Sequence, residues 1–239
     1  MKYFPAQLAQ PALPQSVDLR PLCSPVGEQL AMGSCTGFAI VGALEYLENV
    51  KRKTFVPLSQ QFVYYNERLI EGGTSTDGGS FIEDGISVVL RYGACALSLW
   101  PYNEADLYTK PSDAAYADGL TRRAIKTSSI DQNQTAVMTA LSSGFPVVYG
   151  FVVFDSFETD AVANTGLVPM PNPDKDTALG GHAMLIVGYD VRSQMFLCRN
   201  SWSATWGIKG YCWIPFAYLM TPQLARSFYT IEDIEWPTA

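Results

Sequence analysis

The chain contains five cysteines and a single histidine, His182. A thiol becomes a good nucleophile near neutral pH only when its pKa falls, and a helix N-terminus or a neighbouring imidazolium lowers it. Cys35 stands where a helical apolar pattern begins, so we expect it at the positive end of a helix. His182 follows two glycines and opens an apolar strand, which would hold its ring rigidly. The pair therefore indicates nucleophilic catalysis by a thiol with a histidine base.

The other four cysteines, at positions 23, 95, 198 and 212, permit two disulfides but require none, and no C-x-x-C pair occurs. A structural zinc site would need three or four of these scattered residues, because only one histidine is present. We therefore expect no metal and no cofactor. The four residues are predicted to be small buried apolar side chains.

Four short segments, in this order along the chain, resemble the papain-like cysteine peptidase family. Gln29 stands six residues before Cys35, as the family's glutamine does. A glycine pair ends Thr76–Gly79, and His182 follows Cys35 by 147 residues, within the family's window of about 130 to 150. Asn200–Trp202 matches the family's third signature and continues into further Trp, Gly and Tyr residues. Their joint occurrence is far more specific than any one segment.

The resemblance implies a role for each matched position. In the family, the asparagine carbonyl holds the imidazole, the tryptophan shields that bond, and the glycine pair binds an extended peptide. The catalytic residues implied are Gln29 as oxyanion donor, Cys35 as nucleophile, His182 as general base and Asn200 as orienter. The substrate-binding residues implied are Gly78, Gly79, Phe81, Gly181 and Trp202. The partner is then a peptide or protein, cleaved by an endopeptidase through a thioester acyl-enzyme.

The pocket for the second residue before the cut sets specificity in this family. Its walls here would include Phe81, Gly150 and Gly181, with Arg226 at its base. Apolar walls favour Leu, Phe or Val, and we prefer this alternative. If Arg226 points inward, an acidic side chain is accepted instead.

The chain departs from the family pattern near the nucleophile. Thr36 replaces the usual aromatic residue, and Met32 replaces a cysteine that normally forms a disulfide. Loss of that crosslink suits a compartment where thiols stay reduced. We expect the chain to lack the usual inhibitory prosegment, because only about fifteen residues precede Ser16–Arg20, where the mature family domain begins. Residues 1–15 either overlap the cleft as an inhibitor or anchor the chain on the far side of the second lobe.

Two other functions stay open at this point. Papain-like sites also serve acyl transfer and deamidation, because an acyl-enzyme can be captured by an amine or formed from a side-chain amide. A non-catalytic binding domain on the same scaffold usually lacks the nucleophile or the base, and both are present here.

These residues need an α+β frame to position them. Apolar periodicity predicts helices over about 34–51, 59–70 and 81–91, with Ser59 as an N-cap and Gly93 as a stop. Strands are predicted near 146–153, 182–189, 195–199, 210–214 and 228–231. The fold expected is papain-like and two-lobed, with a helical lobe (about 16–125), a barrel-like antiparallel lobe (about 126–239), an N-terminal extension (1–15) and a cleft between the lobes.

The charge balance limits the partners. The formal net charge is −7 and the isoelectric point is about 4.7, which disfavours nucleic acid and anionic membranes and mildly favours cationic substrates. No apolar run reaches the roughly 18 residues that a membrane span needs, and the first residues form no signal-peptide core. We expect a monomer, and cytoplasmic and exported locations are both open.

Overall fold

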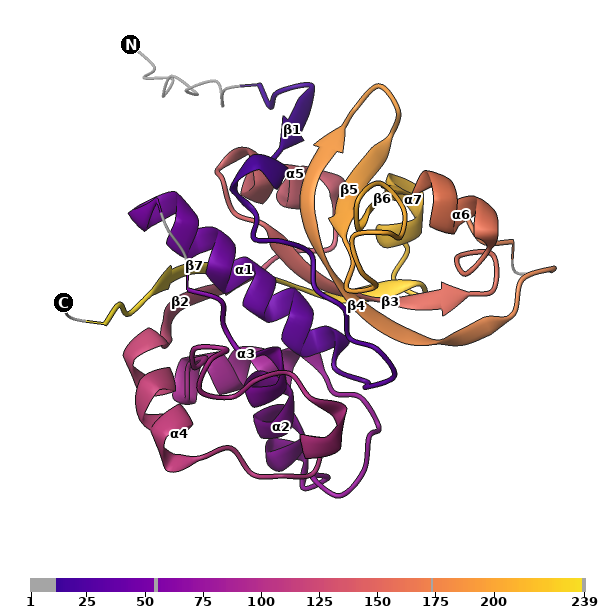
Figure 1. The fold of residues 1–239 in the computed structure, drawn as a ribbon. Coiled ribbons are helices and arrows are strands. Elements are labelled where there is room, and N and C mark those ends of the chain that lie inside the picture. Colours follow the sequence, from indigo (N-terminus) through magenta and orange to yellow (C-terminus); the bar gives the residue numbers. More distant parts are fainter. Residues whose placement is uncertain (1–11, 54–55, 173, 238–239) are drawn as a thin grey trace, which may run out of the picture.

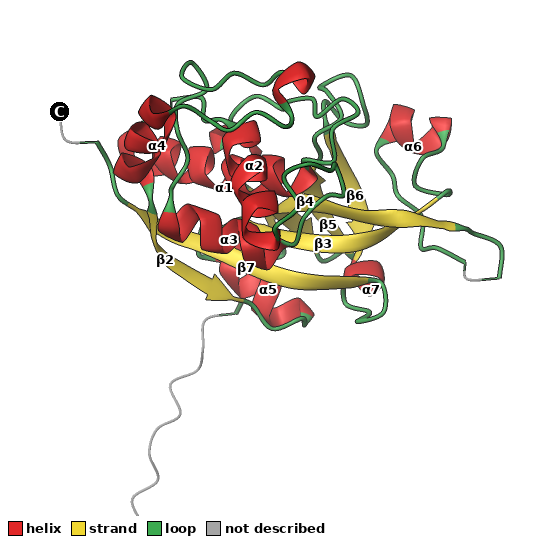
Figure 2. Cartoon of the chain, turned by 90° about the horizontal axis from the view of Figure 1, so that it is seen from below, coloured by secondary structure: helices red, strands yellow, loops and turns green. Residues whose placement is uncertain are grey.

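The computed structural model describes residues 12–53, 56–172 and 174–237. Most of the predicted segment 1–15 therefore lies outside the described residues. The chain forms one antiparallel sheet with helices on both of its faces (Figures 1 and 2). The predicted α+β fold, with helices in the first half of the chain and strands mainly in the second, is confirmed. The sheet is open, however, with β2 and β6 at its edges rather than joined into a barrel.

The first helical layer comes from the N-terminal half. It contains α1 (Cys35–Arg52), α2 (Gln60–Glu71), α3 (Ile82–Arg91) and α4 (Asp113–Gly119). The predicted boundaries of the first three helices are correct to within one residue. Ser59 caps α2 as expected, because its side chain accepts a hydrogen bond from the Phe62 N–H. Gly93 follows α3 in the left-handed region, with φ of 68°, where a Cβ would collide with the Gly119 carbonyl.

The sheet runs in the order β2-β7-β3-β4-β5-β6, and β1 (Ser16–Asp18) pairs with β4. Its other strands are β2 (Ala124–Ser129), β3 (Val147–Phe154), β4 (Ala178–Asp190), β5 (Met195–Arg199), β6 (Tyr211–Pro215) and β7 (Ala225–Ile234). All five predicted strands are present. Sequence reasoning missed β1 and β2, because β1 has three residues and β2 is largely exposed and polar.

Each face of the sheet carries its own hydrophobic core. On one face, α1 to α3 pack over alternate residues such as Val148, Leu185 and Ile231. The opposite face buries Tyr149, Ile186 and Phe228 with α5 (Gln134–Ser142), α6 (Asp160–Thr165) and α7 (Phe216–Leu219). Figure 2 shows α1 to α4 on one side of the sheet and α5 and α7 on the other. The alternation of strand side chains thus builds two cores around one sheet.

None of the described helices is both long and apolar enough to cross a membrane.

Candidate active site

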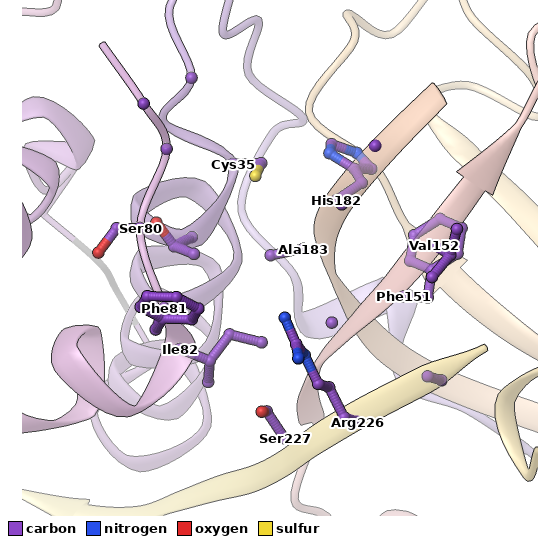
Figure 3. A pocket seen from close by; sticks show the side chains of 18 of the residues that line it. Cys35, Ser80, Phe81, Ile82, Phe151, Val152, His182, Ala183, Arg226 and Ser227 are labelled. Carbon is purple, nitrogen blue, oxygen red and sulfur yellow. The ribbon is translucent and has the colours of Figure 1, made fainter. Parts of the chain in front are cut away.

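A cleft of about 850 Å³ opens where the start of α1 meets the ends of β3, β4 and β7 (Figure 3). Residues from both halves of the chain line it, so the fold brings together segments that are far apart in sequence. The predicted site residues that line the cleft are Gln29, Cys35, Gly78, Gly79, Phe81, Gly181 and His182. Gly150 and Arg226, predicted for the specificity pocket, line it too.

Cys35 is the first residue of α1, as its sequence position predicted. Its neighbour Ser34 is the N-cap, but the Ser34 side chain does not cap the helix; its hydroxyl bonds the Tyr102 hydroxyl at 2.7 Å. The positive end of an 18-residue helix is therefore directed at the cleft. Figure 3 shows Cys35 and His182 facing each other across it.

Asn200 fixes the ring of His182. The His182 Nε2 lies 2.8 Å from the Asn200 Oδ1, and both side chains are buried. The same Oδ1 accepts the Ser201 N–H at 2.8 Å, which identifies it as the amide oxygen. Because an amide oxygen can only accept, Nε2 carries the proton and Nδ1 is left with a lone pair. That lone pair is what a general base needs.

Trp202 is not among the residues that line the 850 Å³ cleft, and its role in substrate binding stays a prediction. Its ring packs against the His182 ring instead, with 5.0 Å between ring centroids and 31° between planes. The ring of Phe151, on β3, lies on another side of the imidazole, with 5.9 Å between the two ring centroids. These rings exclude water around the imidazole and its bond to Asn200, which agrees with the shielding expected of the tryptophan.

Gln29 is placed beside the cleft by hydrogen bonds to the opposite lobe. Its Oε1 accepts the Ser201 hydroxyl at 2.6 Å, and its backbone N–H donates to the Ser201 carbonyl at 2.9 Å. The amide Nε2 donates one hydrogen to the Met32 carbonyl at 3.0 Å. A primary amide has two N–H donors, so the second remains to serve an anion in the cleft.

Sequence reasoning missed the role of Asp77. Its carboxylate accepts the Gly33 N–H with both oxygens at 3.1 Å and also accepts the Tyr64 hydroxyl. The Tyr64 oxygen in turn accepts the Gly79 N–H at 3.2 Å. Asp77 thereby ties the loop before Cys35 to the glycine pair. Its position inside Thr76–Gly79 was the only signal in the sequence.

Thr36, the departure from the family pattern, is also explained by a carboxyl group. Its hydroxyl donates to Oε2 of Glu67 at 2.5 Å, beneath the first turn of α1. Burial raises the pKa of Glu67 to about 8, the Thr36 hydroxyl lowers it, Glu71 and Asp84 raise it, and Arg68 lowers it. The Glu67 Oε1 has no hydrogen-bond partner in the described chain. A neutral carboxyl at this position suits that environment better than a charged one.

Burial also acts on the two reacting groups. Desolvation raises the pKa of Cys35 to about 11, an effect that the backbone N–H of Ala183 partly offsets. Desolvation lowers the pKa of His182 to about 4, and Asn200 opposes this shift. Burial thus disfavours a charge on either group while the other stays neutral. Proton transfer from the thiol to Nδ1 charges both at once, and their mutual attraction and the helix N-terminus favour that state.

The other cysteines carry no chemistry in the described structure. Cys95, Cys198 and Cys212 are buried, Cys23 is partly buried, and all five thiols are free. Met32, in the position of the family's disulfide cysteine, is buried against Tyr64 and Leu107. Among the described residues, no three His, Cys, Asp or Glu side chains gather closely enough to hold a metal ion.

Three comparisons bear on this site. A family model described as "Papain family cysteine protease" matches residues 13–220. An uncharacterized peptidase C1-like protein of Acanthamoeba polyphaga mimivirus is 36% identical over 220 residues, which is 88% of this chain and 70% of the viral one. Cathepsin K of Gallus gallus is 29% identical over 214 residues, 83% of this chain but only 58% of that protein. This chain thus spans less than two thirds of the cathepsin.

A solved structure extends the likeness to the whole fold. The crystal structure of xylellain, a cysteine protease from Xylella fastidiosa, matches with a TM-score of 0.87 and 35% identity. The match covers 99% of this chain and 91% of that one. Its extent includes every segment that lines the cleft.

Proposed function

The chain belongs to the papain family of cysteine proteases and is a papain-like cysteine peptidase; from this premise we propose that Cys35, His182 and Asn200 together hydrolyse peptide bonds. The observation that carries the proposal is the 2.8 Å contact between the His182 Nε2 and the Asn200 Oδ1, which leaves Nδ1 as the basic nitrogen. Nδ1 is the atom to which the thiol of Cys35 would deliver its proton.

Acylation begins when the thiol proton moves to Nδ1 of His182. The thiolate attacks the peptide carbonyl carbon, and the C=O electron pair becomes an oxyanion. The oxyanion collapses, the C–N bond breaks, and the imidazolium gives its proton to the leaving amine. A thioester remains on Cys35. Water, deprotonated by His182, then cleaves the thioester and releases the acid product and the thiol.

Two donors are available for the oxyanion. One is the second N–H of the Gln29 side chain, whose first N–H is held by Met32. The other is the backbone N–H of Cys35 at the start of α1. Loss of one such donor costs about 10²- to 10³-fold in turnover in other hydrolases. Gln29 thus ranks after the reacting pair in importance.

The glycine pair is proposed to receive an extended peptide. A Cβ added at Gly78 would meet no described heavy atom within 4 Å, so the backbone there is open to the cleft. Gly79 has φ of 77°, which residues with a side chain rarely adopt. We expect the active unit to be a monomer. The acidic net charge of the chain disfavours a nucleic-acid partner.

Mass spectrometry of a peptide mixture after incubation tests the proposed reaction. Hydrolysis cuts the backbone, whereas deamidation adds about one mass unit and leaves the backbone whole. Acyl transfer replaces the departing amine or ammonia with an acceptor amine, so the mass changes by the difference between the two. We expect backbone cuts that a thiol-alkylating epoxide abolishes and that Cys35→Ala does not make. Backbone cuts by Cys35→Ala at the wild-type rate would show the assignment to be wrong.

A further inference from the structure

Among the charged side chains that line the cleft, Arg226 alone lacks a partner in the described chain. Each acidic side chain of the cleft accepts hydrogen bonds from the chain itself. Glu71 accepts the Ser80 hydroxyl and the Phe81 N–H. Asp77 accepts the Gly33 N–H and the Tyr64 hydroxyl, and Glu83 accepts the Ser227 hydroxyl. No hydrogen bond or ion pair of the Arg226 guanidinium occurs within residues 12–53, 56–172 and 174–237. An arginine without an internal partner in a substrate cleft is available to a ligand.

A β-bulge determines which way Arg226 points. Along β7, Tyr229 pairs with Val148, and Arg226 pairs with Gly150. Two β7 residues, 227 and 228, thus lie where β3 has only one, and Ser227 takes a left-handed φ of 62°. An extra residue shifts the alternation of side chains by one position. A bulge of this kind at the edge of a cleft re-aims the side chain beside it.

The bulge keeps two apolar residues on the buried face while Arg226 points into the cleft. Ala225 and Phe228, three positions apart, both pack into the core on the far face of the sheet. Regular alternation would place them on opposite faces. Figure 3 shows the Arg226 side chain extending from β7 into the cleft, toward the side that holds Cys35 and His182. The Ser227 hydroxyl fixes the bulge by donating to Glu83 at 2.6 Å.

The floor between Arg226 and the reacting pair is made of small residues. Gly150 pairs with Arg226 on one side and with Ala183 on the other, and Ala183 directly follows His182. Neighbouring strands are about 4.8 Å apart, so Arg226 starts roughly 10 Å from Ala183 across a floor with no side chain at Gly150. Ile82 borders the space above this floor, since its Cδ1 would lie 3.4 Å from a Cβ added at Gly150. Phe81, 56% exposed, contributes a wall.

We propose that Arg226 makes this peptidase select substrates with an aspartate or glutamate side chain in the pocket above Gly150. The inference rests on the proposed function and assigns its substrate class. A guanidinium binds a carboxylate through two parallel N–H donors, and hydrogen bonds to charged groups are the strong ones. An apolar side chain in this pocket would strip water from the guanidinium and return no partner. The pocket therefore favours an acid over the leucine-like residues that its walls alone would suit.

The net charge of the chain does not oppose this selectivity at short range. The formal charge is −7, which acts over long distances and is screened beyond about 8 to 10 Å at physiological salt. A direct contact between Arg226 and a carboxylate lies well inside that distance. We therefore expect salt to weaken the preference for acidic peptides only moderately.

Kinetics on matched peptides test the proposal. Four peptides, identical except for Glu, Gln, Leu or Lys at the position that enters the pocket, are tested as substrates of the wild-type chain, Arg226→Gln and Arg226→Glu. We expect kcat/KM for the Glu peptide to exceed that for the Gln peptide about 10- to 100-fold in the wild type, which is the range for a charged hydrogen bond. The ratio should fall to about one in Arg226→Gln. Arg226→Glu should instead prefer a lysine peptide.

Two controls keep the outcomes distinct. Arg192→Gln makes the same change in net charge at an exposed residue in the turn between β4 and β5, away from the cleft, and should keep the wild-type ratio. Binding of the Glu and Gln peptides to Cys35→Ala, measured without turnover, should show the same preference. Equal rates on Glu and Gln peptides, or a ratio unchanged in Arg226→Gln, would overturn the inference while epoxide labelling of Cys35 still supports the peptidase. Absence of both labelling and cleavage would overturn the proposed function itself.

Discussion

The wall of the cleft that carries Cys35 is held by hydrogen bonds to carboxyl groups, whereas the wall that carries His182 is held by strand pairing and aromatic packing. We call residues 29–36 and 76–79 the nucleophile wall, and β4 with Asn200 and Trp202 the base wall. In the nucleophile wall, Asp77 accepts the Gly33 N–H, and Glu67 of α2, beneath the wall, accepts the Thr36 hydroxyl. The base wall packs His182 between rings and pairs its strand on both sides.

The difference indicates where each wall is sensitive. The structure of a wall that depends on a few carboxyl groups is sensitive to single polar substitutions and to alkaline pH. The reason is that each carboxyl group accepts or supports several hydrogen bonds. A wall built from a sheet and rings tolerates polar changes at its surface, but its buried imidazole must be either neutral or paired with the Cys35 thiolate. Four predictions follow this contrast from the largest expected effect to the smallest.

Removing the reacting groups should have the largest effect. Cys35→Ala and His182→Ala should each lower kcat/KM on peptides at least about 10⁴-fold, because nucleophile and base act as a unit. Asn200→Ala should keep measurable activity, with a loss near 10²-fold, because it orients the ring without reacting. Steady-state kinetics measure all three. Asn164→Ala, at an exposed asparagine of α6, is the matched control and should keep the wild-type rate.

Alkaline pH should destabilise the nucleophile wall through Glu67. Its pKa is raised from 4.5 to about 8 by burial, so the folded state binds its proton more tightly than the unfolded state. The resulting stabilisation is fully present below pH 4.5 and is lost as the pH rises through 8. Its upper limit is about 5 kcal/mol. Glu67→Gln should flatten the fall in the free energy of unfolding between pH 5 and 9, measured by denaturant titration.

In Cys35→Ala, where no thiolate can pair with the ring, acid pH should destabilise the base wall through His182, in the opposite direction. Its pKa is lowered from 6.5 to about 4 by burial, so the unfolded state binds the proton more tightly. The stabilisation is present above pH 6.5 and is lost as the pH falls through 4, with a limit of about 3 kcal/mol. Adding His182→Gln to Cys35→Ala should flatten this acid limb and leave the alkaline limb unchanged. Equal effects of both variants on both limbs would contradict the contrast between the walls.

A smaller loss is expected from Asp77. Asp77→Ala removes the acceptor for the Gly33 N–H and the Tyr64 hydroxyl, so the nucleophile loop should shift and kcat/KM should fall about 10-fold. Asp77→Asn keeps one carbonyl oxygen for Gly33 and should recover part of the rate. Asp131→Ala, at an exposed carboxylate before α5, controls for the change in charge. If the alanine and asparagine variants are equally impaired, the acceptor role is wrong.

Much of this fold could be predicted from the sequence, because its longer elements carry strong local signals. Ser59 and the apolar period after it fix α2, and β5 has the predicted bounds, Met195–Arg199. The short or polar elements could not be predicted: β2 (Ala124–Ser129) is mostly exposed at the sheet edge, so it shows no clear alternation.

The predicted site shows the same limit. The order of Gln29, Cys35, His182 and Asn200 pointed to the cleft, because each lies in a recognisable segment. Glu67 and Asp77 make contacts 31 and 44 residues away, which local pattern cannot reveal. The direction of Arg226 depends on one extra residue in β7, and a bulge leaves no reliable mark in the sequence.

The pH dependence of Cys35 alkylation tests most directly the central claim that Cys35 and His182 act as a pair. The rate of modification by a small thiol reagent is measured from pH 4 to 11 in the wild type and in His182→Ala. The account predicts substantial wild-type reactivity near pH 6 to 8, from a thiolate that the imidazolium stabilises, and in His182→Ala a single limb that rises only above about pH 8.5. Identical profiles, both rising toward the pKa of about 11 that burial alone imposes on the thiol, would contradict it.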